Sequence, residues 1–145
     1  MTDAYVRPDV QMILTMMAQS DQPLMSELEP AAAREMYNMM GAMLEADPVE
    51  LARIEDIACP GPAGDIALRL YDSQADRSAE TPVIMFYHGG GFVIGDLESH
   101  HSFCTYIAHE MDIPVIAVDY RLAPEAPFPA APQDSLAATR WVADH

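Results

Sequence analysis

The sequence predicts an α/β fold built on a partly parallel sheet, and three observations lead to this prediction. Residues 83–87 and 114–118 are short, continuously apolar runs of the kind that form strands buried on both faces. A segment with helical periodicity, 99–111, lies between them, and another helix is predicted after the second run. Strand, helix, strand and helix in succession imply parallel pairing in a doubly wound sheet. Apolar residues make up 50% of the 145 residues, which is enough for a core.

The first 47 residues are predicted to form two amphipathic helices. The apolar residues of the first helix fall on one face: Val6, Val10, Ile13, Leu14 and Met17. The second helix is predicted to begin at Pro30, because proline is well suited to the first helical position. Its apolar side chains are Met36, Met39, Met40, Met43 and Leu44. Nine of the eleven methionines lie in this segment, and their flexible thioether side chains suit an adaptable apolar surface as well as an ordinary core.

A β-hairpin is predicted next, after Asp47-Pro48 ends the helical segment. Residues 53–58 and 65–71 alternate apolar with polar side chains, as half-exposed strands do. The Gly-Pro-Ala-Gly sequence at 61–64 supplies the turn between them. Residues 73–81 are polar and are predicted to form a loop that leads to the first buried strand.

The two helices that alternate with the buried strands are predicted from their apolar spacing. In the first of them, Phe103, Ile107 and Met111 recur every four residues, and Ser99 is a suitable N-cap. Prolines in 127–132 break the chain before the last helix. Three side chains of that helix are expected to face inward: Leu136, Thr139 and Trp141.

The motif His88-Gly89-Gly90-Gly91 follows the first buried strand and is the strongest functional signal in the chain. Consecutive glycines free the backbone to turn sharply, and no side chain fills the space above them. Backbone N–H groups in such a loop point outward, where they can stabilise a negatively charged oxygen. The alternatives are a turn without a ligand and a phosphate-binding loop. The second alternative needs a glycine spacing that is absent, and the chain contains no lysine.

Residues 87–130 contain three motifs in order: HGGGF, GDLESH and DYRLAPEAPFPA. With these motifs the chain resembles the hormone-sensitive-lipase family of α/β-hydrolases, which are mostly microbial carboxylesterases with an HGGG-type oxyanion hole. The resemblance implies that the chain is the N-terminal half of an α/β-hydrolase sheet, with an antiparallel hairpin followed by parallel strands and helices. It also implies that residues 1–47 form a helical cap over the acyl pocket and that 48–145 form the N-terminal half of the core.

The resemblance also implies roles for the residues of the HGGG motif. Gly90 and Gly91 are expected to donate their N–H groups to the oxyanion, and Gly89 is expected to allow the turn. The third N–H donor would follow the serine nucleophile. His88 is expected to brace the loop by hydrogen bonds, because the catalytic histidine of the family lies near the far C-terminus.

A nucleophile of the family type is missing from the sequence. The family places its serine in Gly-x-Ser-x-Gly, and none of the serines here lies between glycines. We therefore expect the chain to act with a C-terminal half that carries the Ser-Asp-His triad. The leading hypothesis is a serine carboxylesterase of small, short-acyl esters. The alternatives are a homologue that binds a small molecule without hydrolysing it and an inactive truncated product.

Four polar residues cluster at and just beyond the end of the second buried strand: Asp119, Tyr120, Arg121 and Glu125. We predict that they form a buried network of hydrogen bonds and ion pairs that holds the loop beneath the site. Within this network, Arg121 is suited to bind a carboxylate in a bidentate manner.

The composition limits the classes of ligand and partner. A formal net charge of −16 excludes nucleic acids and anionic membranes as favoured partners. Cys59 and Cys104 fit no zinc motif and are predicted to be free buried thiols. His100 and His101 cannot share a helical face, so we expect no metal, and no motif indicates a cofactor. The N-terminus lacks a basic signal region and no run is long enough to span a membrane, which predicts a cytoplasmic protein; a homodimer is left open.

Overall fold

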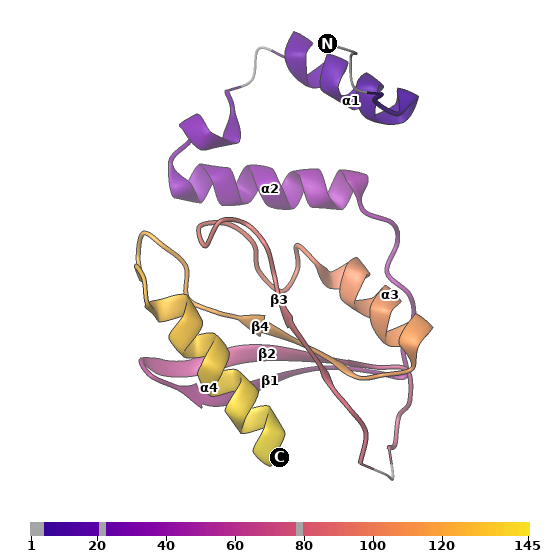
Figure 1. Ribbon diagram of the computed structural model, residues 1–145, viewed down its shortest axis with the longest axis vertical. Helices are drawn as coiled ribbons and strands as arrows, with labels where there is room; N and C mark the ends of the chain where they lie inside the picture. The colour runs from indigo at the N-terminus through magenta and orange to yellow at the C-terminus, as the bar shows by residue number, and fades with distance from the viewer. Residues whose placement is uncertain (1–4, 21–22, 78–79) are drawn as a thin grey trace.

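The computed structural model describes residues 5–20, 23–77 and 80–145 (Figure 1). Its helices are α1 (Pro8–Gln19), the 3-10 helix η1 (Met25–Glu27), α2 (Pro30–Leu44), α3 (His101–Met111) and α4 (Ala130–Asp144). Its strands are β1 (Arg53–Gly61), β2 (Gly64–Asp72), β3 (Ile84–Tyr87) and β4 (Val115–Asp119). The predicted polar loop includes residues 78 and 79, which lie outside the described residues, as do residues 1–4 and 21–22 of the predicted cap.

The four strands form one sheet in the order β1-β2-β4-β3. β1 and β2 form the predicted antiparallel hairpin, and Gly61 lies opposite Gly64 at its turn. β3 and β4 are parallel, as the alternation of strands and helices predicts. β4 also pairs antiparallel with β2, so the sheet is mixed and the predicted hairpin-then-parallel order is confirmed. Because β3 and β4 are parallel neighbours, the loops that follow them begin side by side.

β4 is buried on both faces, as predicted from its apolar run. Its side chains alternate between the two faces of the sheet. Val115 and Ala117 pack with residues of α3, whereas Ile116 and Val118 pack with residues of α4. Full burial of a valine or isoleucine side chain is worth about 1.5–3 kcal/mol, so β4 contributes to both halves of the core.

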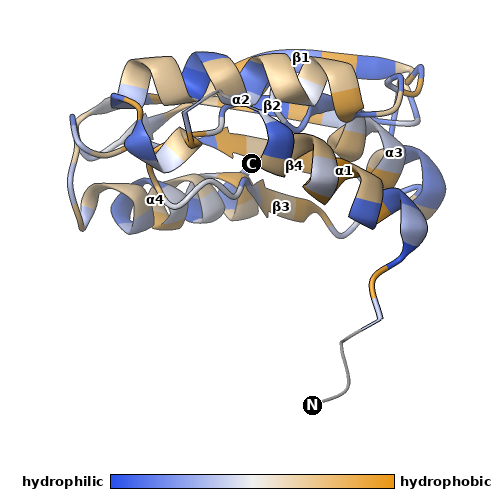
Figure 2. Ribbon diagram, turned by 90° about the horizontal axis from the view of Figure 1, so that it is seen from above, coloured by the Kyte–Doolittle hydropathy of each residue, from blue (hydrophilic) through white to orange (hydrophobic). Residues whose placement is uncertain are grey.

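β3 is less buried than its sequence predicts, although Figure 2 shows it to be as apolar as β4. Its first three side chains are half-buried and Tyr87 is exposed. β3 lies at the edge of the sheet, next to β4 and no other strand of the described residues. The apolar run therefore correctly predicts a strand, but the expected burial on both faces is wrong for this position in the sheet.

α3 forms where its apolar spacing predicts a helix, and it presents small side chains to the sheet. Its buried residues are Cys104, Thr105 and Ala108. Phe103 and Met111 are exposed, and Ile107 is half-buried. Small side chains let the helix lie close to the strands, where interior packing is dense. The predicted N-cap is wrong by one residue, because His100 precedes the first helical residue.

α4 begins within the proline-rich stretch and likewise packs through small residues. Its buried residues are Ala130, Ala131, Asp134 and Ala138. Leu136 and Thr139 are exposed, which contradicts the predicted inward face, whereas Trp141 packs partly against the core as expected. Apolar spacing thus indicated that a helix forms but not which side faces the sheet.

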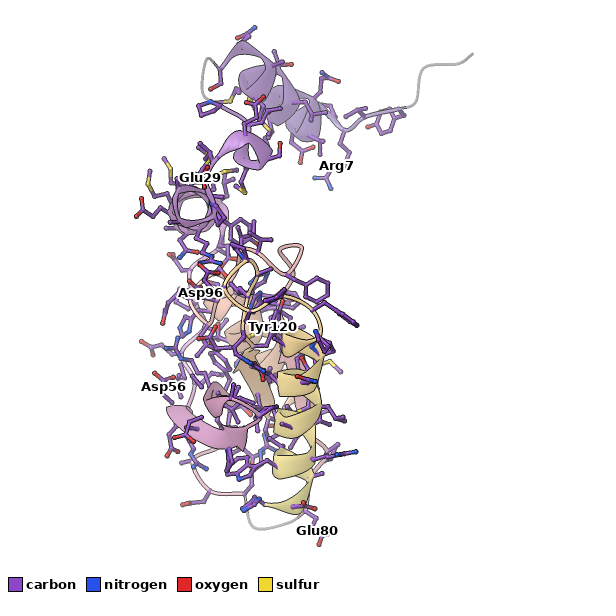
Figure 3. All side chains as sticks on the ribbon, turned by 90° about the vertical axis from the view of Figure 1, so that its left-hand side faces the viewer. Arg7, Glu29, Asp56, Glu80, Asp96 and Tyr120 are labelled. Carbon is purple, nitrogen blue, oxygen red and sulfur yellow. The ribbon has the colours of Figure 1, made fainter. Side chains whose placement is uncertain are left out.

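The N-terminal segment contains the two predicted helices, and they differ in burial. α2 begins at Pro30, as predicted, and buries Ala33. α1 begins at Pro8, so Val6 precedes it, and none of its residues is buried. Figures 1 and 3 both show α1 separated from the sheet by α2. Within the described residues, no helix combines the length and the apolar character needed to cross a membrane.

Candidate active site

The glycine-rich loop (88–95) follows β3 and contains the HGGG motif. Gly90 and Gly91 have φ angles of +122° and +62°, which glycine adopts more readily than other residues. A Cβ atom on Gly90 would lie 2.0 Å from the carbonyl oxygen of Ile94, so only glycine fits there. Gly89 has no positive φ, and a Cβ on it would meet nothing within 4 Å. The turn expected at Gly89 is therefore made by Gly90 and Gly91.

Several carbonyl groups of the glycine-rich loop accept hydrogen bonds from the protein itself. The Gly90 carbonyl accepts hydrogen bonds from the N–H groups of Val93 and Ile94, both at 3.1 Å. The Phe92 carbonyl accepts one from the N–H of Ala123 at 2.8 Å. By contrast, the N–H groups of Gly90 and Gly91 bind no acceptor in the described part of the chain. Two backbone donors are thus available to a ligand, next to carbonyls that are held in place.

His88 lies at the base of this loop and is 5% exposed. Its Nδ1 is 2.8 Å from the Gly89 carbonyl oxygen, and its backbone carbonyl accepts a hydrogen bond from the Tyr120 hydroxyl. The Tyr120 ring stacks on the imidazole, with centroids 4.3 Å apart and planes at 11°. Gly95 leaves room for the ring, because a Cβ there would lie 2.3 Å from Nδ1. These contacts fit the predicted bracing role of His88.

One residue of α2 contacts the glycine-rich loop and another contacts Asp96 just after it, and sequence reasoning did not identify either. Arg34 donates from Nε to the Val93 carbonyl at 2.8 Å. Asn38, one turn later on the same face, donates to Asp96 Oδ2 at 2.8 Å. Figure 3 shows Asp96 beneath α2. The only available signal was a lone basic residue in a helix rich in alanine and methionine.

Asp96 organises the segment between the glycine-rich loop and α3. Its Oδ1 accepts hydrogen bonds from the N–H groups of Glu98 and Ser99, at 3.0 and 2.7 Å. The Ser99 hydroxyl accepts one from the Asp96 N–H in return, so Ser99 closes this turn instead of capping α3. Burial raises the pKa of Asp96, but the hydrogen bonds from Ser99, Asn38 and Glu98 outweigh it, so the pKa falls below its ordinary value. The carboxylate is therefore ionised at neutral pH.

The support loop (120–126) follows β4 and contains three of the four polar residues predicted to form a network. Arg121 binds Asp134 of α4 through Nε at 2.8 Å and Nη2 at 2.7 Å, which confirms that it can hold a carboxylate in a bidentate manner. Glu125 pairs with Arg34, and Tyr120 pairs with His88. The fourth residue, Asp119, is exposed at the end of β4. The predicted single network is instead three separate contacts, each to a different element.

The histidines of α3 and its N-cap do not converge. The ring centroids of His100 and His88 are 5.9 Å apart. Burial lowers the pKa of His100, and the neighbouring His88 lowers it further. His101 instead faces Tyr71 and Arg69 of β2. Among the described residues, no three His, Cys, Asp or Glu side chains come close enough to hold a metal ion. Cys59 and Cys104 are buried free thiols, as predicted.

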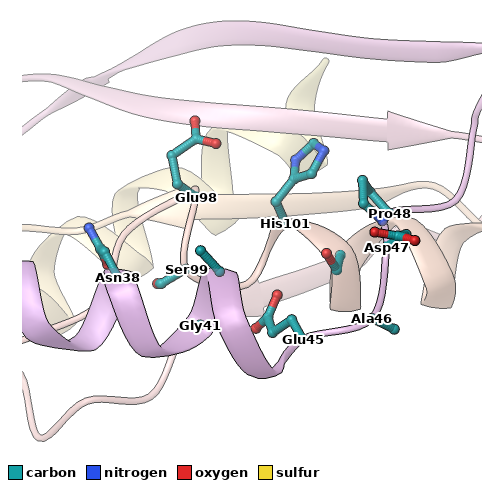
Figure 4. A pocket seen from close by; sticks show the side chains of 11 residues that line it. Asn38, Gly41, Glu45, Ala46, Asp47, Pro48, Glu98, Ser99 and His101 are labelled. Atoms are coloured by element: carbon teal, nitrogen blue, oxygen red, sulfur yellow. The ribbon is translucent and has the colours of Figure 1, made fainter.

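A cavity of about 340 Å³ lies between the C-terminal half of α2 and the start of α3 (Figure 4). Asn38 of α2 and Glu45, the residue after this helix, border it on one side, and Ser99 and His101 border it on the other. None of its lining residues belongs to the glycine-rich loop. The two unpaired glycine N–H groups therefore lie outside this cavity.

The fold and its loop sequence have relatives among known proteins. A family model for the α/β hydrolase fold matches residues 84–145. The chain is 52% identical over 94 residues to the esterase LipI of Mycobacterium tuberculosis, a match that covers 64% of this chain and 29% of LipI. It is 36% identical over 122 residues to an ethyl acetate hydrolase of Pseudomonas putida, covering 83% of this chain and 38% of that protein.

A solved structure agrees over nearly all of the chain. An ester hydrolase from the metagenome of Lake Arreo, complexed with a derivative of bipyridine phosphonate, matches with a TM-score of 0.89 and 37% sequence identity. The match covers 97% of this chain and 45% of that one. The chain thus spans less than half the length of each of these three relatives.

Proposed function

We propose that this chain, which is similar to esterases of the α/β hydrolase fold, supplies the oxyanion hole and the cap of a serine carboxylesterase of the hormone-sensitive-lipase family. The nucleophile belongs to a C-terminal half that carries the Ser-Asp-His triad. Residues 1–47 are the cap and 48–145 are the N-terminal half of the core. The substrates are small esters with short acyl chains.

The observation that carries this proposal is the hydrogen bonding of the glycine-rich loop. When a nucleophile attacks an ester, its carbonyl oxygen gains negative charge. The N–H groups of Gly90 and Gly91 have no acceptor in the described residues, while the neighbouring carbonyls are bound. Donors held in place before the reaction need no rearrangement, and one such donor lowers the barrier by about 2.7–4 kcal/mol.

The preference for short acyl chains is supported by one relative and by the cap. The relative from Pseudomonas putida is named for the hydrolysis of ethyl acetate. On α2, Met36 is half-buried and Met43 is 81% exposed. Flexible methionine side chains can repack around a small apolar group. We therefore propose that the methionines of residues 1–47 are the adaptable part of the cap; those of α2 lie on the side opposite the face that carries Arg34 and Asn38.

The test is an assay with two forms of the protein. One is residues 1–145 alone, and the other is the assembled enzyme, in which this chain is fused to the C-terminal part of LipI. We expect no hydrolysis of p-nitrophenyl acetate by the first form, because it lacks the nucleophile. The assembled enzyme should hydrolyse acetate and butyrate esters faster than octanoate. A folded assembled enzyme that binds the ester without turnover would contradict the proposal, as would activity of residues 1–145 that depends on one of their own serines.

The cap assignment has its own test in the assembled enzyme. Deleting residues 1–20 removes α1, which has no buried residue, so the free energy of unfolding should change by less than about 0.5 kcal/mol. The KM and the acyl-length preference should both change, because the cap covers the acyl pocket in this proposal. A truncated enzyme that keeps both would show that α1 is not part of the cap.

A further inference from the structure

Arg34 is the point where α2 meets both loops of the site. Its guanidinium donates to the Val93 carbonyl at 2.8 Å and to the Ala123 carbonyl at 3.0 Å. It also binds the two carboxylate oxygens of Glu125, at 2.9 and 2.7 Å. One planar side chain therefore joins α2, the glycine-rich loop and the support loop. An ammonium group could not reproduce this arrangement, because it lacks the rigid fork of donors.

Together these contacts form a connected set of hydrogen bonds around the backbone of Phe92, Val93 and Ala123. The Val93 N–H donates to the Gly90 carbonyl, and the Val93 carbonyl accepts from Arg34. The Ala123 N–H donates to the Phe92 carbonyl, and the Ala123 carbonyl accepts from Arg34. Arg34 thus fixes the backbone on both sides of one loop-to-loop hydrogen bond.

We propose that Arg34 is a positioning residue for ester hydrolysis: by holding Val93 and the support loop, it sets the orientation of the Gly91 N–H group, which shares a peptide plane with the Gly90 carbonyl. This inference rests on the proposed function for its kinetic consequence. Arg34 does not touch the reacting atoms in this account. It acts through Val93, whose N–H donates a hydrogen bond to the Gly90 carbonyl.

Glu125 keeps the guanidinium in its place over the working range of pH. The hydrogen bonds from Arg34 lower the pKa of Glu125 to about 2, so the carboxylate is ionised at any pH at which an esterase is assayed. The Arg34 side chain is 28% exposed, compared with 47% for Arg53, so water competes less for its donors. The charge state of this ion pair therefore does not change over the pH range of an esterase assay.

The chain offers two matched control residues. Asn38 fastens the same helix to Asp96, one turn from Arg34, but makes no contact with the carbonyls of residues 90–93. Arg53 pairs with Glu55 on β1, far along the chain from either loop. If Arg34 only anchored α2, Asn38→Ala would produce the same defect. If the loss of any ion pair caused the defect, Arg53→Gln would show the same defect.

The experiment compares Arg34→Gln, Arg34→Lys, Asn38→Ala and Arg53→Gln in the assembled enzyme. We expect Arg34→Gln to lower kcat for p-nitrophenyl acetate by about 10- to 100-fold with less than about a threefold change in KM, because misplaced donors weaken transition-state binding. Arg34→Lys should lower kcat nearly as much as Arg34→Gln does, because lysine lacks the fork of donors. Amide hydrogen exchange of residues 88–95 should be at least about tenfold faster in both Arg34 variants and unchanged in both controls.

Hydrogen exchange separates this inference from the proposed function. If the parent enzyme has no esterase activity but exchange in 88–95 still rises only in the Arg34 variants, the proposed function fails and the positioning role stands. Unchanged exchange in 88–95, or an equal increase in Asn38→Ala, would overturn the positioning role. If Arg34→Gln does not fold, Arg34→Lys decides the question by the same measurements.

Discussion

The loops after β3 and β4 begin side by side, yet they use their polar groups in opposite ways. In the glycine-rich loop, the carbonyls of Gly90, Phe92 and Val93 accept hydrogen bonds, whereas the N–H groups of Gly90 and Gly91 have no acceptor in the described residues. The support loop pairs its side chains with α2, α4 and His88. A site for a developing anion needs free donors and a rigid frame around them. In the proposed site, the loops after the two parallel strands would supply these separately.

The largest expected effect comes from changing the donor loop. Gly90→Ala places a Cβ 2.0 Å from the Ile94 carbonyl oxygen at a φ of +122°, so the backbone must move and the donor moves with it. In the assembled enzyme we expect kcat to fall by about 10²- to 10³-fold, the loss measured when one oxyanion donor is removed. Steady-state hydrolysis of p-nitrophenyl acetate measures this.

Gly89→Ala is the matched control for that variant. It makes the same chemical change one residue earlier, where a Cβ meets nothing within 4 Å and φ is not positive. We expect kcat within about threefold of the parent enzyme, because the substitution requires no backbone movement. Equal losses in Gly89→Ala and Gly90→Ala would mean that the loop is not built as described.

Removing the carboxylate that Arg121 of the support loop binds should lower the stability of the protein more than its catalytic activity. Asp134→Ala leaves Arg121 without its bidentate partner and removes a carboxylate that is 1% exposed. We expect the free energy of unfolding to fall by about 3 kcal/mol, the lower end for a broken buried pair, because Arg121 is 36% exposed. Urea unfolding measures this, and Glu55→Ala, which breaks an exposed pair, should cost less than about 1 kcal/mol. Similar losses in the two variants would remove the distinction between them.

The same pair predicts a pH dependence of stability. Burial raises the pKa of Asp134, but the hydrogen bonds and charge of Arg121 outweigh it and hold the pKa below its ordinary value of 3.8. A carboxyl whose pKa is lower in the folded state stabilises the fold above pH 3.8 and loses that contribution as pH falls through the folded value. The stability difference between the parent enzyme and Asp134→Asn should therefore be constant from pH 7 to pH 5 and shrink below pH 3.8. A stability difference that grows below pH 3.8 would contradict this prediction.

The smallest expected effect is at the contact between the two loops. Tyr120→Phe removes the hydroxyl that donates to the His88 carbonyl and keeps the ring that stacks on the imidazole. We expect a loss of about 1 kcal/mol in the free energy of unfolding, the usual net value of one hydrogen bond. Thermal or urea unfolding measures it. A loss above about 3 kcal/mol would show that His88 depends on the hydroxyl far more than its stacking suggests.

The sequence predicted the elements that have strong local signals. Pro30 marks the start of α2, and the Gly-Pro-Ala-Gly turn at 61–64 marks the hairpin. The HGGG motif located the glycine-rich loop from its own four residues. These features depend on backbone preferences of neighbouring residues, which a sequence shows directly.

Orientation and long-range contacts could not be predicted in the same way. α3 and α4 face the sheet through alanine, threonine and cysteine, which add little to an apolar pattern, while Phe103 and Leu136 are exposed. Arg34 is 59 residues from Val93 and 91 from Glu125 along the chain. Nothing near Arg34 in the sequence indicates either partner, because the parallel strands bring the two loops together and α2 packs against both loops.

The most direct test of the central claim is a crystal structure of the assembled enzyme after reaction with a phosphonate ester. The phosphonate bound to the serine nucleophile imitates the tetrahedral intermediate, and its negatively charged oxygen stands for the oxyanion. We predict that this oxygen lies about 2.7–3.1 Å from the backbone nitrogens of Gly90 and Gly91. A phosphonate oxygen bound elsewhere, with both nitrogens more than about 3.5 Å away, would contradict the assignment of the oxyanion hole to this loop.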